Sequence, residues 1–107
     1  MLLILAKHQL RDMRRMAQKN HNFQPGVILH EVIVGAFRAR GLTFEGWCKD
    51  NGLTPMNGRN ATFGQSRGVI GKRNLERIID AAGREFVLEA YRRRVAEHFS
   101  QLQKGAA

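Results

Sequence analysis

The chain has 107 residues, the size of one small domain, and 43% of them are hydrophobic, which is enough for a modest core. Its 18 Lys and Arg residues outnumber 9 Asp and Glu residues, so the formal net charge is +9. This charge favours a polyanionic partner, either nucleic acid or an acidic membrane surface, and it is also compatible with a plain basic protein. The only cysteine, Cys48, excludes an intramolecular disulfide and fits a reducing cytoplasm.

The chain opens on a short apolar run, Met1 to Ala6, followed at once by basic residues. The run is too short for a secretory core or a membrane span. Leu2 to about Asn20 has the periodicity of an amphipathic helix with a net charge of +4, from five basic residues and one acidic residue. Such a helix can be a basic arm on DNA, a dimerisation helix, or a core helix with a solvated basic face. Membrane-surface binding is a weaker alternative. A loop is expected over residues 20–26.

The next predicted helix runs from Val27 to Arg40 and ends at Gly41. Its apolar stripe is formed by Leu29, Ile33, Ala36 and Phe37, widened by Ile28 and Val32. From here through Leu53 the chain has three basic and three acidic residues, so its net charge is zero. We expect this neutral, apolar segment to form the structural floor of the domain.

Residues 43–62 have the pattern of two short helices joined by a tight turn. Thr43 is a candidate cap for the first helix, and Gly52 suits the left-handed backbone of a helix exit. Thr54 and Pro55 then provide a cap and a first helical residue for the second helix. The first helix has one apolar face, formed by Phe44, Trp47 and Cys48. This spacing is typical of a DNA-binding helix-turn-helix.

The run Asn51-Gly-Leu-Thr-Pro-Met-Asn-Gly-Arg-Asn-Ala61 resembles the motif of the Ner-type repressors of transposable phages, which belong to the lambda-repressor-like helix-turn-helix proteins. The resemblance covers roughly residues 28–83. The family carries a branched apolar residue in the middle of the second helix, where this chain has Gly58. We therefore expect the second helix to be short or bent, or Met56 or Phe63 to supply the missing contact.

The resemblance implies that the exposed side of the second helix enters the major groove of DNA. The residues expected at base edges are Met56, Asn57, Arg59 and Asn60. Arginine suits guanine and asparagine suits adenine, because each can form two hydrogen bonds there. Ordinary exposed polar residues are the alternative for the two asparagines.

Residues 54–76 carry four basic residues and one acidic residue, a net charge of +3. Glycines in the run from Phe63 to Gly71 predict a loop, which could follow the phosphate backbone, and the next helix is expected to begin at Lys72 to Asn74. The predicted phosphate contacts are Thr54, Gln65, Ser66, Arg67, Lys72 and Arg73.

Beyond Leu75 the pattern predicts a core helix, a break at Gly83 and a final helix from Arg84 to about Gln103. The core helix has a stripe of Leu75, Ile78, Ile79 and Ala82. The stripe of the final helix either packs on the chain's own core or forms a two-fold seam. Because the helix is about 30 Å long, too long for this domain to cover, we expect a homodimer. The predicted interface residues are Leu88, Tyr91, Val95, His98 and Leu102.

Enzyme and metal patterns fail on spacing. The run from His30 to Val34 lacks the second histidine of the zinc motif HExxH, and one cysteine with scattered histidines does not suit a structural zinc site. The run from Ser66 to Arg73 lacks two required residues of a phosphate-binding loop. We therefore expect no enzyme, no metal and no cofactor.

The sequence thus predicts an all-α protein with a lambda-repressor-like helix-turn-helix, in one domain over residues 1–107. An N-terminal basic helix and loop (1–26), a helix-turn-helix core (27–83) and a C-terminal helix with a short tail (84–107) make up this domain. The expected function is a sequence-specific, double-stranded-DNA-binding transcriptional regulator of bacterial, phage or mobile-element genes, cytoplasmic and nucleoid-associated. The alternatives are a protein-interaction module that contacts RNA polymerase or another regulator, and RNA binding, which the aromatic residues on apolar faces disfavour.

Overall fold

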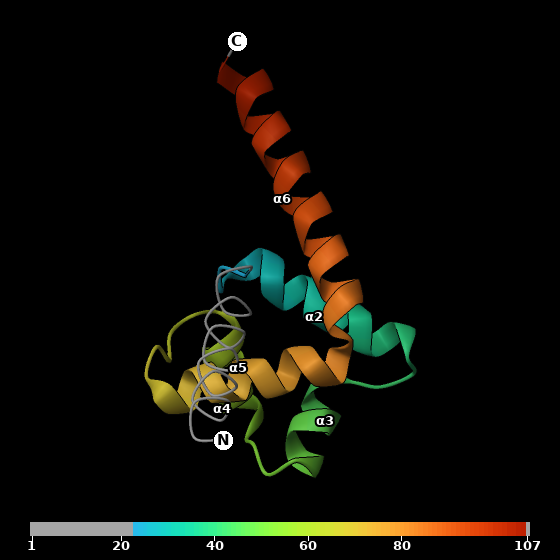
Figure 1. Ribbon diagram of the computed structural model, residues 1–107, viewed down its shortest axis with the longest axis vertical. Coiled ribbons are helices and arrows are strands. Elements are labelled where there is room, and N and C mark those ends of the chain that lie inside the picture. The colour runs from blue at the N-terminus through green and yellow to red at the C-terminus, as the bar shows by residue number, and fades with distance from the viewer. Residues whose placement is uncertain (1–22, 107) are drawn as a thin grey trace, which may run out of the picture.

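The computed structural model describes residues 23–106, and every regular element in that range is an α-helix (Figure 1). The expectation of an all-α fold is therefore confirmed for this part of the chain. The predicted helix over residues 2–20 lies outside the described residues. The helices are α2 (Val27–Ala39), α3 (Phe44–Asp50), α4 (Pro55–Thr62), α5 (Val69–Ala82) and α6 (Arg84–Ala106).

The predicted caps are present at the two short helices. The Thr43 hydroxyl accepts a hydrogen bond from the Gly46 amide at 3.0 Å, and the Thr54 hydroxyl accepts one from the Asn57 amide at 3.1 Å. Each bond satisfies an amide that has no partner within its helix. At the exit of α3, Gly52 has φ 77°, a left-handed conformation that favours glycine. The turn between α3 and α4 is therefore determined by local chemistry, as the sequence predicted.

The core lies between α2 and α5. The predicted stripes of both helices are buried, and Phe37, Ile33 and Ile78 are fully enclosed. The α3–α4 pair closes one side of this core with Phe44, Cys48 and Ala61, and α6 adds Val87. Burial of each large side chain contributes roughly 1.5–3 kcal/mol of stability. The neutral segment from Val27 to Leu53 was expected to form the structural base of the domain, and it supplies a large part of the buried core.

Helix α5 begins earlier than predicted. The sequence indicated a loop from Phe63 to Gly71, but the helix starts at Val69, after Gly68. Gly71 lies so close to the preceding loop that a Cβ atom there would stand 2.1 Å from the Ser66 carbonyl oxygen. The glycine that suggested a loop is therefore needed because helix and loop approach closely. Lys72 to Asn74 consequently lie within the helix, beyond its first free amides.

Helix α6 leaves the rest of the molecule after its first two turns (Figure 1). Val87 is buried, and Leu88, Ala90 and Tyr91 pack against the core, but every described side chain from Arg92 onward is exposed. The Arg94 guanidinium bonds the Glu31 carboxylate of α2 at 2.9 Å and fastens the base of the projecting part. In the described part of the chain, no helix is long and apolar enough to cross a membrane.

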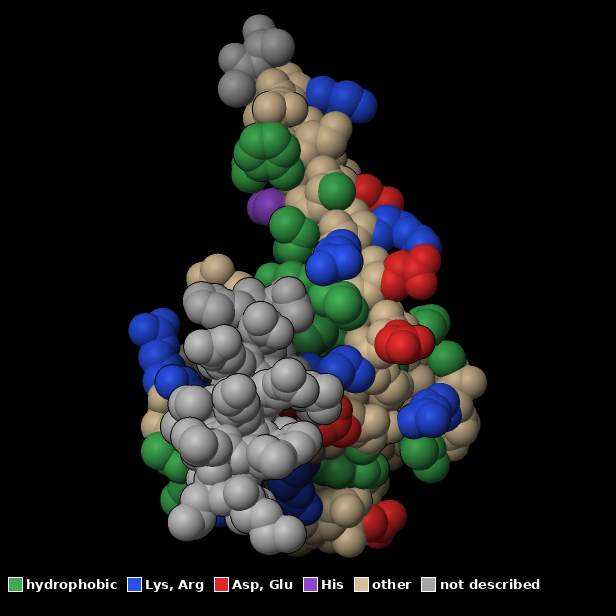
Figure 2. Space-filling view, viewed as in Figure 1, with side chains coloured by type: hydrophobic (Ala, Val, Ile, Leu, Met, Phe, Trp, Pro, Cys, Tyr) green, Lys and Arg blue, Asp and Glu red, His purple; other side chains and the backbone are tan. Residues whose placement is uncertain are grey.

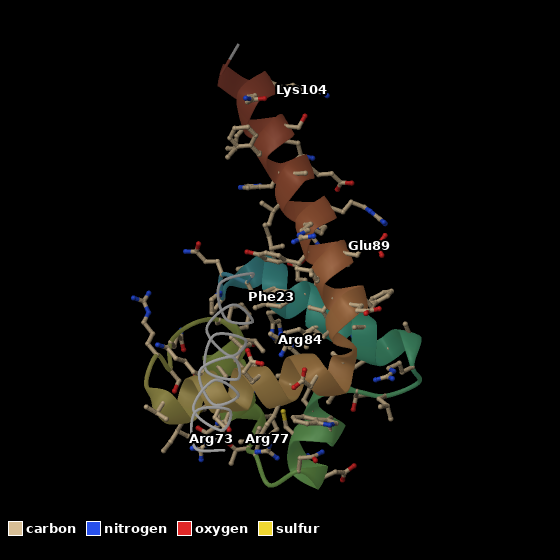
Figure 3. All side chains as sticks on the ribbon, viewed as in Figure 1. Phe23, Arg73, Arg77, Arg84, Glu89 and Lys104 are labelled. Carbon is tan, nitrogen blue, oxygen red and sulfur yellow. The ribbon has the colours of Figure 1, made fainter. Side chains whose placement is uncertain are left out.

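A polar cluster stabilises the junction of α5 and α6. Arg84, the first residue of α6, bonds the carboxylates of Glu76 and Asp80 and lies over the ring of Phe23 at 6.0 Å (Figure 3). Gly83 separates the two helices with φ 104°. The break predicted at this glycine is confirmed.

Candidate nucleic-acid interface

Gly58 is the point where α4 packs on α3. The residue is buried, and a Cβ atom on it would lie 2.6 Å from the Cys48 sulfur and 3.1 Å from Cζ of Phe44. Phe44 and Cys48 thus fill the space that a larger side chain at position 58 would need. Burial also raises the pKa of the Cys48 thiol, with a smaller contribution from Glu45, so this sulfur acts as an apolar packing group.

The two residues expected to compensate for Gly58 do not do so. The Met56 side chain is 67% exposed, and Phe63 stacks on His30, with the ring centroids 4.3 Å apart. Helix α4 has eight residues, so the expectation of a short second helix is confirmed.

His30, on α2, holds the C-terminal end of α4 through a hydrogen bond to Thr62. Its Nδ1 lies 2.8 Å from the Thr62 hydroxyl, which itself donates to the Arg59 carbonyl at 3.1 Å. Because that hydroxyl has one hydrogen, Nδ1 must be the donor to Thr62, which selects one neutral tautomer. Burial first, and then the nearby Arg59 guanidinium, lower the pKa of His30 below 6.5. Sequence reasoning used His30 only to reject a zinc motif, since its partner is 32 residues away.

The residues predicted at base edges are brought together on one side of α4. Met56, Asn57 and Arg59 are exposed, whereas Asn60 is half-buried. Arg59 lies 3.8 Å from the Glu45 carboxylate, and both side chains remain about half exposed to solvent. A pair this open is worth little, so Arg59 can exchange its partner at small cost. The exposed side of α4 therefore presents a cation, an amide and a thioether together.

The loop that follows α4 is built onto the end of that helix. The backbone amides of Gln65 and Ser66 both donate to the Asn60 carbonyl, at 2.9 and 3.1 Å. Gln65, Ser66 and Arg67 have exposed side chains, and Arg67 Nε donates to the Gly64 carbonyl at 3.1 Å. The three predicted phosphate contacts in this loop therefore stay accessible at one end of α4. Thr54, at its other end, is exposed and serves as the cap.

Lys72 and Arg73 point to different sides of α5. Lys72 shares a hollow of about 520 Å³ with Ser66 and Arg67. Arg73 lies one helical turn before Arg77, on the edge of α5 that faces the α3–α4 turn (Figure 3). The predicted position of these cations at the start of α5 is wrong, because that helix starts at Val69. The first turn instead exposes two apolar side chains, Val69 and Ile70.

Arg77 is a positioning residue that the sequence did not single out. Its guanidinium donates to the Asn51 carbonyl at 3.0 Å and lies over the Trp47 ring at 5.9 Å. It thereby fixes α5 to the turn before α4. No local pattern signals this role, since the two partners are 26 and 30 residues away in the sequence.

Comparison with known protein families, curated proteins and solved structures finds no match for this chain. The described residues contain no cluster of three His, Cys, Asp or Glu side chains that could hold a metal ion.

Proposed function

We propose that this protein is a sequence-specific, double-stranded-DNA-binding transcriptional regulator of the lambda-repressor-like type, with α4 as the helix that enters the major groove. The observation that carries the proposal is the state of α4. It is capped, held on α3 by the close contact at Gly58, and exposes Asn57 and Arg59. A groove-reading helix needs this combination of a rigid base and a free polar side.

The charge around α4 supports the same function. Residues 54–76 carry a net charge of +3: Arg67 lies in the loop that follows α4, and Lys72 and Arg73 lie on α5, which packs against α4. Cations placed beside a reading helix neutralise phosphates and set its register, while base contacts set its specificity. Glu45 is the acidic side chain that lies next to Arg59 on this side.

The test begins with selection of bound fragments from random duplex DNA, followed by titrations of the selected site at several salt concentrations. We expect Arg59→Ala to weaken binding by about 1–3 kcal/mol and to reduce sequence preference. Lys72→Ala should weaken all sequences alike and lower the salt slope by about one unit. Arg93→Ala is the charge-matched control, because this exposed residue of α6 lies outside the interface and should reduce affinity least.

A change in the opposite direction sharpens the test. Glu45→Gln removes the carboxylate beside Arg59, so it should tighten DNA binding. If Arg59→Ala keeps full sequence preference and Glu45→Gln has no effect, α4 is not the reading helix.

A protein-interaction module is the second candidate, favoured by exposed apolar side chains on α4 and on the first turn of α5. Met56, Val69 and Ile70 are 67%, 76% and 72% exposed. Such side chains suit a partner such as a regulator or an RNA polymerase subunit. Retention on duplex DNA at about 150 mM salt, with sequence competition, separates the two functions. Loss of retention with every competitor would favour the protein partner.

A further inference from the structure

The exposed part of α6 carries an apolar stripe that no other described residue of the chain covers. Val95, Phe99 and Leu102 are 39%, 61% and 60% exposed. Figure 2 shows hydrophobic side chains on one side of the projecting helix, with a histidine among them. The residues predicted for a dimer interface therefore divide into two groups. Val95, His98 and Leu102 are exposed on the projecting part of α6. Leu88 and Tyr91 pack within the chain, and Tyr91 also accepts a hydrogen bond from the Gln24 amide at 3.0 Å.

A groove adjoins this stripe. It has a volume of about 670 Å³ and lies between α6 and the chain that leads into α2. Ile28 and Tyr91 form its inner wall, while His98 and Gln101 continue it along the projecting part of α6. Val27, on its rim, is 59% exposed. Stripe and groove are thus neighbouring parts of one surface, joined at His98.

We infer that this surface binds a second copy of the chain, with the two α6 helices antiparallel and the end of each lying in the groove of the other. The interface is then isologous, because each chain supplies both a stripe and a groove. The projecting segment, residues 92–104, is about 20 Å long, and a bare helix face of that length falls short of the roughly 800 Å² per partner that stable interfaces bury. Burial of the groove as well increases the area on both chains.

The chain's own fold disfavours the parallel arrangement. The N-terminal half of the stripe is already covered by α2 and Phe23, whose ring centroid lies 5.6 Å from that of Tyr91. In a parallel pair, α2 and Phe23 of both chains would lie between the two α6 helices at the same height along the axis and would keep the helices apart. In an antiparallel pair they lie at opposite ends, and each meets the free end of the other helix.

The charges on α6 favour the same orientation. Arg92, Arg93 and Arg94 are consecutive, whereas residues 99–103 carry no charge. A parallel pair would bring six arginines to one level. Glu89 and Glu31 offset part of this charge through their bonds to Arg93 and Arg94, and the remaining like charges oppose association at close range. The antiparallel pair places each run of arginines beside the uncharged segment of the other chain. One register brings Leu102 of one chain next to Tyr91 of the other, and Val95 next to His98.

Sedimentation equilibrium of the full chain without DNA tests the pairing, so its outcome does not depend on the proposed function. We expect a dimer for the unaltered protein and a monomer for Phe99→Asp/Leu102→Asp. The control is Ser100→Asp/Lys104→Gln, which changes the net charge by the same amount on the opposite side of the same helix and should leave the dimer intact. Circular dichroism checks that both variants keep their helices. A monomeric unaltered protein, or a dimer that survives in the stripe variant, would overturn the inference.

Disulfide trapping tests the orientation, and Cys48 does not interfere because it is buried. A mixture of Val95→Cys and His98→Cys chains should form mixed disulfides under mild oxidation. Leu102→Cys alone should form none, because the two sulfurs of an antiparallel pair would be about 16 Å apart along the axis, beyond the reach of a disulfide. Ready cross-linking of Leu102→Cys would show a parallel pair instead.

Discussion

Gly58→Ala is the substitution on which the structure and simple helix propensity disagree most clearly. Alanine in place of glycine inside a helix should stabilise it by about 0.5–1 kcal/mol. At Gly58 the new methyl group would lie 2.6 Å from the Cys48 sulfur and 3.1 Å from the Phe44 ring, and both side chains are fully buried. Overpacking of this kind costs about 1–3 kcal/mol. The contact should outweigh the propensity, so we expect a net loss of about 1 kcal/mol.

Urea unfolding measures this loss, and the fluorescence of Trp47, the single tryptophan, reports on the α3 side of the contact. Gly35→Ala is the matched control. Gly35 lies inside α2, and a Cβ atom there would meet nothing within 4 Å. This variant should therefore gain the propensity term of about 0.5–1 kcal/mol. If Gly58→Ala is stabilised as much as Gly35→Ala, the close packing of α4 on α3 is refuted.

A double-mutant cycle identifies the atom responsible. Cys48→Ala removes the sulfur that stands nearest to the new methyl group, so it should lessen the cost of Gly58→Ala. We expect a favourable coupling of about 1 kcal/mol, within the range found for residues in contact. Additive effects would show that the sulfur is not the obstacle.

Two further predictions concern the support of α4. Because the pKa of His30 is lowered below 6.5, the unfolded chain binds a proton more readily than the folded chain; stability should be full above pH 6.5 and should decline as the pH falls below it, by at most about 1.4 kcal/mol per unit. Urea unfolding at pH 5 to 7 should show a steeper pH dependence for the unaltered protein than for His30→Gln, and equal slopes would contradict the neutral, donor role of this imidazole. Thr54→Ala removes the cap of α4 and should cost about 1 kcal/mol of unfolding free energy. Thr54→Ser, which keeps the hydroxyl, should lose much less, and a similar loss in both variants would show that the capping bond does not stabilise α4.

The sequence by itself determined the features that depend on neighbours within one or two helical turns. Thr43 and Thr54 cap their helices, and Gly83 separates α5 from α6, because each effect involves atoms a few residues away. The apolar stripes of α2 and α5 were equally predictable, since a periodicity of 3.6 residues places them on one face. The exposed polar side of α4 follows from the same periodicity.

Tertiary structure alone decided the contacts between residues that are distant in sequence. Glycine has no side chain to signal its surroundings. Gly58 therefore indicated a weakened helix and Gly71 a loop, whereas Gly58 lets α4 approach Cys48 and Phe44 of α3, and Gly71 lets α5 approach Ser66. The support of Thr62 by His30 and of the α3–α4 turn by Arg77 spans about 30 residues, and no local pattern encodes such pairs. Which residues of the α6 stripe are buried likewise depends on tertiary structure. Leu88 and Tyr91 pack against the core and Val95 and Leu102 are exposed, because burial is set by the packing partner and not by the periodicity of the helix itself.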